Sequence, residues 1–430
     1  MKILVVGGGG REHALVWMLS KSPLVRALYA APGNPGMARH ATCLPIRADA
    51  PDDLVGFARR EGIDLTVVGP EAPLVAGLAD RFTEAGLPVF GPSAAAAAIE
   101  GSKAFAKELM AEHGIPTARF RTFEDPSAAR QYCRDVGAPV VVKASGLAAG
   151  KGVIVCRTLE EADRAVGECM ERRAFGAAGA TVVIEEMLVG EEVSFFALAN
   201  GTDAVALAAA QDHKTVFDDD RGPNTGGMGA YSPVPGFDAA AEKRVMETIV
   251  RPTVAALARA GRPYRGVLFV GLMMAEDGPK VLEFNCRFGD PECQAILARS
   301  SGDLLPSLVA AGRGDALPAG EGMPTHEAAD VAVCVTLASG GYPGEYRTGF
   351  PIEGVEAAEA IPGVHVFHAG TARRDERLVT AGGRVLGVTA VAPDVAGAID
   401  AAYKAVAAIR FDGMHYRSDI ARKALKRRSA

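Results

Sequence analysis

The amino-acid sequence predicts a multidomain α/β protein. Its 430 residues exceed what one ordinary hydrophobic core encloses, and a chain of this length divides into about three domains. The 50 glycines and 26 prolines indicate many short elements joined by tight turns rather than long helical bundles. Over the first region, short β-rich runs alternate with helical runs, which is the pattern of βαβ units.

The first region, residues 1–102, is expected to hold a parallel sheet of the Rossmann-like kind. Its predicted elements are strands at Ile3–Val6, Ala27–Ala30, Asp64–Val68 and Pro88–Phe90, and a helix at Glu12–Ser20. The run Asp64–Val68 is followed by Gly69-Pro70-Glu71, and sheets of this class bind ligands at the carboxyl ends of their strands. We therefore expect a small-molecule site at that edge.

Two further regions follow. Residues 103–325 are expected to form a second domain with a flexible lid subdomain at about residues 117–192, and residues 326–430 a β-rich third domain. The predicted strands of the second region are Pro139–Ala144, Val153–Cys156, Thr181–Glu186, Val193–Leu198, Gly266–Met274 and Lys280–Asn285. Those of the third are Ala329–Leu337, Val364–Ala369 and Arg384–Val391, before a helix at Val395–Ile409.

Composition and charge exclude several classes of protein. The formal net charge is −6 and the basic residues are dispersed, apart from a run at Lys423–Arg428 that is typical of a solvated helix end. Nucleic acid is therefore not an expected partner. The seven cysteines form no C-x-x-C pair, which favours buried thiols in a reducing compartment. Because neither a signal peptide nor a membrane-spanning stretch is evident, we expect a cytoplasmic protein without membrane association. No obligate protein partner is evident from the sequence.

A glycine-rich segment, Gly7–His13, follows the first strand and opens the first helix. Backbone N–H groups and the positive end of a helix make such a loop a cradle for phosphate. The dinucleotide fingerprint G-x-G-x-x-G/A fails in both registers, because Glu12 and His13 stand where its last small residue is required. Nicotinamide binding is thus disfavoured, and a phosphate-bearing ligand is favoured over a plain tight turn.

A second glycine-rich segment runs from Lys143 to Gly152, between two predicted strands. It differs from a P-loop, because Gly146 and Gly150 are too close, a glycine replaces the required Ser or Thr, and no helix follows. The segment is either a surface turn or a β-hairpin lid whose amides and lysines close over polyphosphate. Lys143 and Lys151 bracket the glycines and favour the lid.

Polar residues also recur at a strand spacing. Glu283 and Asn285 lie two apart on a predicted strand, so their side chains project from the same face. Two oxygen ligands suit Mg²⁺, which completes its octahedron with phosphate and water. Chance polar residues on a partly exposed strand are the alternative, but the apolar Leu282 and Phe284 beside them favour the metal.

Two more segments carry weaker signals. The acidic run from Glu185 to Glu192 is by itself typical of a solvated turn. Asp212-His213-Lys214 precedes a glycine-rich loop, Gly222–Ser232, which brings backbone close to a small ligand or forms a mobile loop. His213 taken alone is expected to be structural.

Taken together, these segments resemble the phosphoribosylamine–glycine ligase (glycinamide ribonucleotide synthetase) family of the ATP-grasp superfamily, over nearly the whole chain. The matching segments are GGGREHAL at Gly8–Leu15, APGNPG at Ala31–Gly36, VGPEAPLV at Val68–Val75, EGSKAF at Glu100–Phe105, GLAAGKGV at Gly146–Val153, QDHK at Gln211–Lys214, GPNTGGMGAYSP at Gly222–Pro233, EFNCRFGDPE at Glu283–Glu292, GGYPG at Gly340–Gly344, FHAGT at Phe367–Thr371 and GGRVL at Gly382–Leu386.

The resemblance implies a carbon–nitrogen ligase of purine biosynthesis with an ATP-grasp domain. It joins glycine to 5-phosphoribosylamine with ATP and Mg²⁺ or Mn²⁺, through glycyl phosphate. The metal ligands it implies are Glu283 and Asn285, and the catalytic residues are Arg287, Asp212 and Lys143. The implied ATP-binding residues are Lys103, Lys143, Gly146, Gly150, Lys151, Gly152, Glu185, Leu188 and Glu192. The implied substrate-binding residues are Gly8, Gly9, Gly10, Arg11, Asn34, Glu71, Asp212, Asn224, Arg287 and Asp290.

The sequence departs from the family pattern in places. Asp219 stands where members usually have glycine, and the strand Val267–Met274 carries no carboxylate for a second metal ion, which would then be held mostly by nucleotide phosphates. The alternatives are an ATP-grasp carboxylase that phosphorylates bicarbonate, a nicotinamide-dependent oxidoreductase, and a non-catalytic nucleotide-binding regulator.

Overall fold

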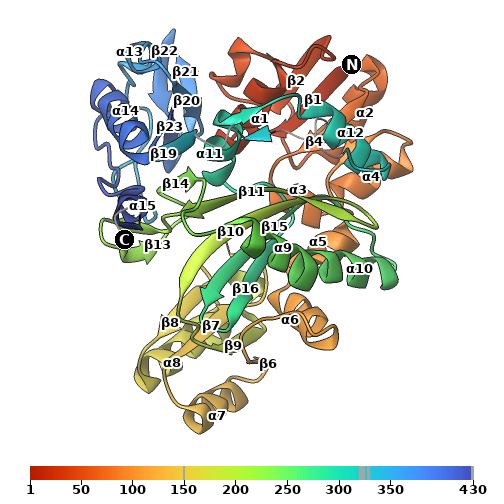
Figure 1. Cartoon of the computed structure of the whole chain (residues 1–430), viewed down its shortest axis with the longest axis vertical. Helices are drawn as coiled ribbons and strands as arrows, with labels where there is room; N and C mark the ends of the chain where they lie inside the picture. Colours follow the sequence, from red (N-terminus) through yellow and green to blue (C-terminus); the bar gives the residue numbers. More distant parts are fainter. Residues whose placement is uncertain (149–150, 319–324, 327–329, 428–430) are drawn as a thin grey trace.

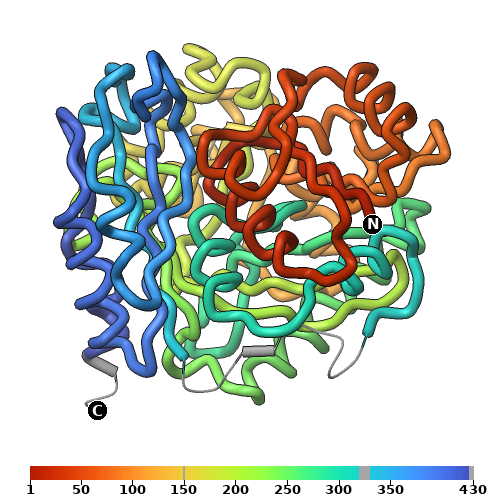
Figure 2. Tube along the Cα trace, turned by 90° about the horizontal axis from the view of Figure 1, so that it is seen from above, coloured from red at the N-terminus to blue at the C-terminus, as the bar shows by residue number. Residues whose placement is uncertain are grey.

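The structure, a computed structural model, describes residues 1–148, 151–318, 325–326 and 330–427. The N-terminal and C-terminal parts lie side by side at one end of the molecule, and a small lid lies at the opposite end (Figures 1 and 2). A central sheet runs between them (Figure 1). The expected ATP-binding residue Gly150 lies outside the described residues.

The N-terminal part is built on a parallel sheet with strand order β3-β2-β1-β4-β5, which confirms the predicted parallel sheet. Its strands are β1 (Lys2–Gly7), β2 (Ala27–Pro32), β3 (Thr42–Cys43), β4 (Leu65–Val68) and β5 (Val89–Phe90). Its helices are α1 (Gly10–Leu19), α2 (Pro51–Glu61), α3 (Glu71–Val75), α4 (Leu78–Glu84) and α5 (Ala94–Gly101). The chain leaves β1 toward β2 on one side and reaches β4 on the other, so the carboxyl ends of β1 and β4 form a topological switch point, where sheets of this class bind ligands.

The lid has its own sheet and core. Helix α6 (Lys103–Glu112) leads into an antiparallel sheet of order β6-β9-β7-β8. Its elements are β6 (Phe120–Phe123), α7 (Pro126–Val136), β7 (Val140–Ala144), β8 (Val153–Cys156), α8 (Leu159–Val166) and β9 (Val182–Glu186). Helix α7 begins where it does because Asp125 accepts hydrogen bonds from two amides of the first turn and Pro126 occupies the first helical position. The buried side chains between the helices and this sheet form a separate small core.

Within the described residues, an eight-stranded sheet of order β16-β15-β10-β11-β14-β19-β23-β20 joins the remaining parts. Its strands are β10 (Glu191–Asn200), β11 (Ala204–Asp212), β14 (Gly229–Ser232), β15 (Arg265–Ala275), β16 (Gly278–Asn285), β19 (Val331–Ala338), β20 (Val364–His368) and β23 (Arg384–Ala392). Because β14 pairs with β19, the sheet continues across the expected boundary between residues 325 and 326. The second and third regions therefore share one sheet.

Shorter elements complete the fold. The helices are α9 (Ala239–Val245), α10 (Arg251–Arg259), α11 (Glu292–Ala298), α12 (Leu305–Arg313), α13 (Val355–Glu359), α14 (Val395–Ala408) and α15 (Arg422–Arg427). The short strand pairs are β12 (Thr215–Phe217) with β13 (Arg221–Asn224), β17 (Ser300–Ser301) with β18 (Thr325–His326), and β21 (Thr371–Arg374) with β22 (Arg377–Thr380). Among the described helices, none is long and apolar enough to cross a bilayer.

The C-terminal segment fixes the turn between β12 and β13. The Asp219 amide donates to Asp419 (2.9 Å), and the fully buried Arg417 pairs with Asp220 (3.1 Å). Asp219 has φ +59°, a left-handed conformation, which explains why glycine suits this position. The buried His213 lies behind this turn and accepts a hydrogen bond from the Ala421 amide (3.2 Å), which agrees with its expected structural role.

Candidate active site

The amides at the start of α1 face carboxylates of the same chain. Gly9 N donates to Glu12 Oε2 (2.7 Å), and Arg11 N donates to Asp290 Oδ2 (3.4 Å). The positive end of the helix stabilises both carboxylates, and Arg384 and Arg11 hold the pKa of Asp290 low although burial alone would raise it. A phosphate bound at this loop would therefore have to replace side chains that already satisfy the amides.

Asn34 holds the loop through its side-chain amide, and its expected contact with a substrate stays a prediction. Its Nδ2 donates to the carbonyls of Gly8 (2.9 Å) and His368 (2.8 Å), and its Oδ1 accepts from the amides of Gly36 (2.9 Å) and Met37 (3.0 Å). Both donors and both lone pairs of the side-chain amide are used. The physical consequence is that the first glycine loop is tied to the C-terminal domain.

Arg287 connects the switch point of the N-terminal sheet with β16. Its Nε lies 3.2 Å from Glu71 Oε2, and its Nη2 lies 2.9 Å from Glu100 Oε1 and 3.1 Å from Asn285 Oδ1. Glu71 Oε2 also lies 3.9 Å from Arg11 Nη1. The two carboxylates outweigh burial and raise the pKa of Arg287 above its ordinary value. The side chain therefore stays a cation.

One face of the central sheet carries several polar side chains. Ser194 on β10 pairs with Gly271 on β15, and Gly271 pairs with Glu283 on β16, so the three form a row. Glu192 lies two residues from Ser194, and Asp212 lies two residues beyond the partner of Ser194 on β11. Because strand side chains alternate between faces, all of these project from the same face. Figure 1 shows this part of the sheet between the N-terminal part and the lid.

Glu283 and Asn285 fit a hard cation. The register places both on this face, as their spacing predicts. Burial would raise the pKa of Glu283, but nearby Lys214, Lys103 and Lys143 hold it below its ordinary value, so the group is a carboxylate. Asn285 Oδ1 accepts from Arg287, while its Nδ2 is buried without a partner. Among the described residues, no three His, Cys, Asp or Glu side chains gather as a complete metal site, so the remaining ligands would be phosphate and water.

Asp212 is a half-buried carboxyl near other acids. Burial raises its pKa to about 7 against the attraction of Lys214, and the charges of Glu292 and Glu192 add to the rise. Lys214 itself forms an ion pair with Glu192. A further cation placed beside Asp212 would relieve this excess of negative charge.

Glu185 is buried between two lysines. Its Oε2 lies 3.0 Å from Lys107 Nζ and 2.9 Å from Lys143 Nζ, and both partners are nearly inaccessible. Lys143 also donates to the Leu282 carbonyl (2.9 Å). Burial lowers the pKa of Lys107 to about 8, against the attraction of Glu185. Glu185 Oε1 is buried without a partner, which is uncommon in a folded protein and suits a ligand with an amino group.

The described part of the second glycine loop is tied to α6. Lys103 N donates to the Ser145 carbonyl (2.7 Å), and Lys103 Nζ lies 3.4 Å from the Gly146 carbonyl. An added Cβ at Gly146 would lie 2.8 Å from Ala178, and one at Gly152 would lie 2.7 Å from another loop side chain. Close packing therefore requires glycine at both positions. The contacts of Lys103 also bring it to the same loop as Lys143.

The C-terminal domain reaches this region through its loop at residues 340–344 and through Arg384. Lys151 Nζ donates to the Pro343 carbonyl (2.9 Å), so this lysine contacts the C-terminal domain rather than the Lys103–Lys143 pair. The Gly226 amide donates to the Tyr342 hydroxyl (3.0 Å), and Arg384 Nη1 donates to the Gly226 carbonyl (2.6 Å). The loop at Gly222–Ser232 is therefore in close contact with side chains of the C-terminal domain.

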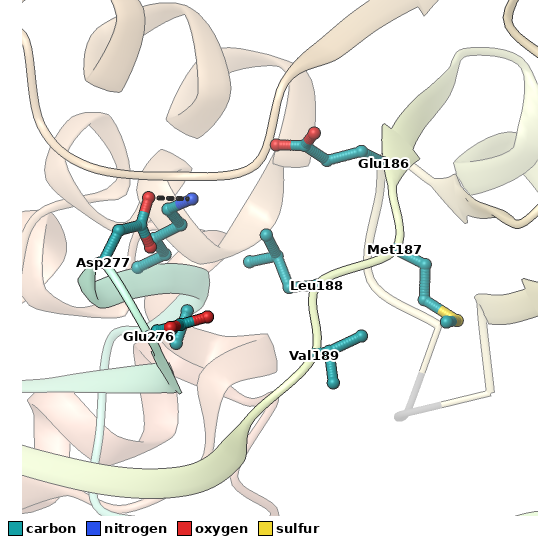
Figure 3. Close-up of a pocket in the computed structure, with 8 residues that line it drawn as sticks. Glu186, Met187, Leu188, Val189, Glu276 and Asp277 are labelled. Carbon is teal, nitrogen blue, oxygen red and sulfur yellow. Dashed lines mark ion pairs between the residues drawn. The ribbon is translucent and has the colours of Figure 1, made fainter.

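The connection between β9 and β10 borders a groove of about 400 Å³. Its lining residues are Glu186, Met187, Leu188, Val189, Ala275, Glu276, Asp277 and Lys280. The side chain of Leu188 extends toward Asp277, and that of Met187 points the opposite way (Figure 3). Because the Leu188 side chain points away from the Met187 side, a nucleotide bound on that side would contact the backbone of Leu188.

Sequence patterns missed several residues of this region. Lys107 follows Lys103 by one helical turn, so the helix period could have revealed it. Glu12, Glu100 and Glu292 lie in segments that carry the family resemblance, but no local spacing marks them. The Ser194 hydroxyl donates to Glu292 Oε1 (3.0 Å) from a strand far away in the sequence. Asn224 ends β13 and is half-buried.

Comparisons with known proteins agree along the whole chain. Models of phosphoribosylglycinamide synthetase match its N domain at residues 1–100, its ATP-grasp (A) domain at 101–293 and its C domain at 332–423. The phosphoribosylamine–glycine ligase of Rhizobium meliloti is 52% identical over 430 residues, covering 100% of both chains. The crystal structure of phosphoribosylamine–glycine ligase from Thermotoga maritima is 32% identical with a TM-score of 0.83, covering 97% of this chain and 100% of that one.

A more distant structure shares the fold alone. It is the biotin carboxylase domain of Hydrogenobacter thermophilus 2-oxoglutarate carboxylase, in complex with MgADP, ADP and bicarbonate. It is 19% identical with a TM-score of 0.73, covering 96% of this chain and 91% of that one. From the full-length matches above, the chain belongs to the phosphoribosylglycinamide synthetase family, with an ATP-grasp domain between its N and C domains.

Proposed function

We propose that the chain joins glycine to 5-phosphoribosylamine with ATP, giving glycinamide ribonucleotide, ADP and phosphate in purine biosynthesis. One observation carries the proposal: a single sheet face presents a pair of hard-cation ligands and the half-buried carboxyl of Asp212, with the cationic side chains of Lys103, Lys143, Lys214 and Arg287 around them. The name shared by the full-length relatives supports the identity of the substrates.

The chemistry explains why so many cations gather. A carboxylate is a poor electrophile, so its oxygen first attacks the γ-phosphorus of ATP, the bond to ADP breaks, and glycyl phosphate forms. Two anions that repel must be held together for this step, and fixed positive charge supplies most of that stabilisation. Lys103, Lys143 and Arg287 would provide it. A divalent cation on Glu283 and Asn285 would, when bound, neutralise phosphate charge.

The nucleotide would lie between the lid and the central sheet. The unpartnered Oε1 of Glu185 would accept from the adenine amino group, and Lys143 would lie beside the same ring. The Leu188 backbone would contact the base, Glu192 the ribose, and the loop from Gly146 to Gly152 the phosphates. Closure of the lid would also keep water from the acyl phosphate.

Glycine would lie on the same sheet face. Arg287 would orient its carboxylate, since a planar guanidinium makes two parallel contacts with an oxyanion. Asp212 would hold its ammonium group, the additional cation that its environment lacks. The amine of phosphoribosylamine then attacks the carbonyl carbon, the bond to the phosphate oxygen breaks, and the nitrogen loses a proton.

Phosphoribosylamine would lie at the switch point of the N-terminal sheet, against the loop from Gly8 to Arg11. Glu71 and Asp290 present carboxylates there, which suit hydroxyl and amino groups better than phosphate. Asn224 would contribute from β13. The sugar would thus enter next to Arg287, where the acyl phosphate forms.

The test is phosphate release from MgATP with the substrates added separately and together. We expect release to require both glycine and phosphoribosylamine; release that ignores either amine substrate, or that depends on bicarbonate, would refute the proposal. Glu283→Ala should abolish turnover with the fold intact, whereas Glu276→Ala, on the exposed turn of the same hairpin, should leave it unchanged. Equal turnover in the two variants would remove the metal assignment.

A further inference from the structure

Glu100 belongs to the N-terminal domain, yet both of its oxygens are used by the segment that follows β16. Oε1 accepts from Arg287 Nη2 (2.9 Å), and Oε2 accepts from the Cys286 amide (2.6 Å). The residue is 8% exposed and stands in the last turn of α5. A carboxylate is disfavoured at that end of a helix, because the helix dipole is negative there. Its position therefore depends on the groups it contacts.

The same Arg287 Nη2 also lies 3.1 Å from Asn285 Oδ1, the oxygen proposed above as a cation ligand. A guanidinium and a divalent cation compete for that oxygen, because both are positively charged. Glu71 offers a second anchor on the Nε side (3.2 Å), but it does not contact Nη2. Among the contacts that the structure describes, Glu100 is thus the acid that shares Nη2 with Asn285.

We propose that Glu100 is a positioning residue that shares the Arg287 Nη2 group with the Asn285 oxygen, weakens the hold of Arg287 on that oxygen, and thereby sets the affinity of the site for its divalent cation. This inference rests on the proposed function, in which Asn285 is a metal ligand. Without the charge of Glu100, Nη2 would donate to Asn285 alone, and a cation would have to displace it. The Cys286 amide would also face a weaker, uncharged acceptor, which leaves the ligand strand less well fixed.

The experiment measures cation binding directly. Mn²⁺ is titrated into the full chain in the presence of ADP, and free Mn²⁺ is followed by electron paramagnetic resonance. For Glu100→Gln we expect the Kd of Mn²⁺ to rise about tenfold or more. The Mg²⁺ concentration for half-maximal turnover should rise in parallel, and saturating Mg²⁺ should restore most of the turnover. Glu108→Gln, an exposed position on the neighbouring helix α6, should change neither quantity.

A conservative variant separates positioning from packing. Glu100→Asp keeps the charge and should show a smaller rise in the Kd of Mn²⁺ than Glu100→Gln. A Kd within about twofold of wild type for Glu100→Gln, or lost turnover that Mg²⁺ does not restore, would overturn the inference. If Glu100→Gln does not fold, Glu100→Asp decides the question, because its shorter side chain moves the carboxylate away from Nη2: a Kd of Mn²⁺ equal to that of wild type would overturn the inference. Absence of Mn²⁺ binding in the wild-type protein would instead refute the metal assignment in the proposed function.

Discussion

Glu185→Gln tests the buried charge cluster beneath the expected nucleotide. The change keeps the shape of the side chain but leaves Lys107 and Lys143 facing a neutral amide. Removing one partner of a buried ion pair costs about 3–5 kcal/mol. Because Lys143 retains the Leu282 carbonyl, we expect about 3 kcal/mol of lost unfolding free energy. The KM for MgATP should rise about tenfold, since a hydrogen bond to a charged acceptor is lost.

The neighbouring residue supplies a matched control. Glu186 pairs with Arg119 (2.7 Å), whose side chain is 88% exposed, so Glu186→Gln should cost about 0.5 kcal/mol or less. Both variants are unfolded with urea at pH 7 and followed by circular dichroism. Equal losses from the two variants, or a loss below about 1 kcal/mol for Glu185→Gln, would refute the idea that burial makes the Glu185 charge important.

The pH dependence gives an independent check. Burial holds the pKa of Lys107 at about 8 in the native protein, and loss of Glu185 removes the main opposing attraction. In the variant, Lys107 is then neutral in the folded state near pH 7, while the unfolded chain remains protonated up to about pH 10. As the pH is raised, the free energy of unfolding therefore begins to increase at a lower pH in the variant than in the wild type. The difference in unfolding free energy between the wild type and Glu185→Gln should decrease by about 1 kcal/mol between pH 7 and pH 8. A difference that stays constant over this range would contradict this reasoning.

Three further predictions concern other parts of the chain. Asp219→Gly should stabilise the protein by about 0.5 kcal/mol without changing turnover, because the left-handed strain is removed at some entropic cost; a urea titration measures it. Burial, with Arg417 and Lys423 nearby, lowers the pKa of His213 to about 4. The unfolded chain therefore takes up a proton first as the pH falls, and stability should drop by up to about 3 kcal/mol between about pH 6.5 and 4, a drop that His213→Gln should reduce. Arg287→Lys should lower kcat about 100-fold in steady-state assays while the KM for MgATP stays within about twofold, and unchanged kcat would exclude its role.

The sequence predicted the elements of the fold better than their connections. The run Ile3–Val6 and its successors lie within β1, β2, β4 and β5 or overlap them, because alternation of strand and helix signals parallel pairing locally. The continuity of the central sheet had no such signal. Strand β14 is four residues long, and its partner β19 begins about a hundred residues later, so nothing in the local pattern indicated that they pair.

The candidate site divides in the same way. The spacing of Glu283 and Asn285 placed both on one face, since a strand period of two decides that question. At Leu282 the ladder shifts between Gly271 and its neighbour, and the side chain is half-buried rather than fully inward as the alternation suggested. The contacts of Glu100 with Arg287 and the Cys286 amide join residues far apart in sequence, so only the tertiary structure could reveal them.

The shared sheet makes the last hundred or so residues part of the catalytic scaffold. Strand β14 is flanked by β11, which ends at Asp212, and by β19 of the C-terminal domain. A shortened chain that ended before β19 would leave a bare row of backbone donors and acceptors along β14, one strand away from that carboxyl. An exposed edge strand pairs with strands of other molecules. Removal of the domain would therefore cause self-association and would also displace Asp212.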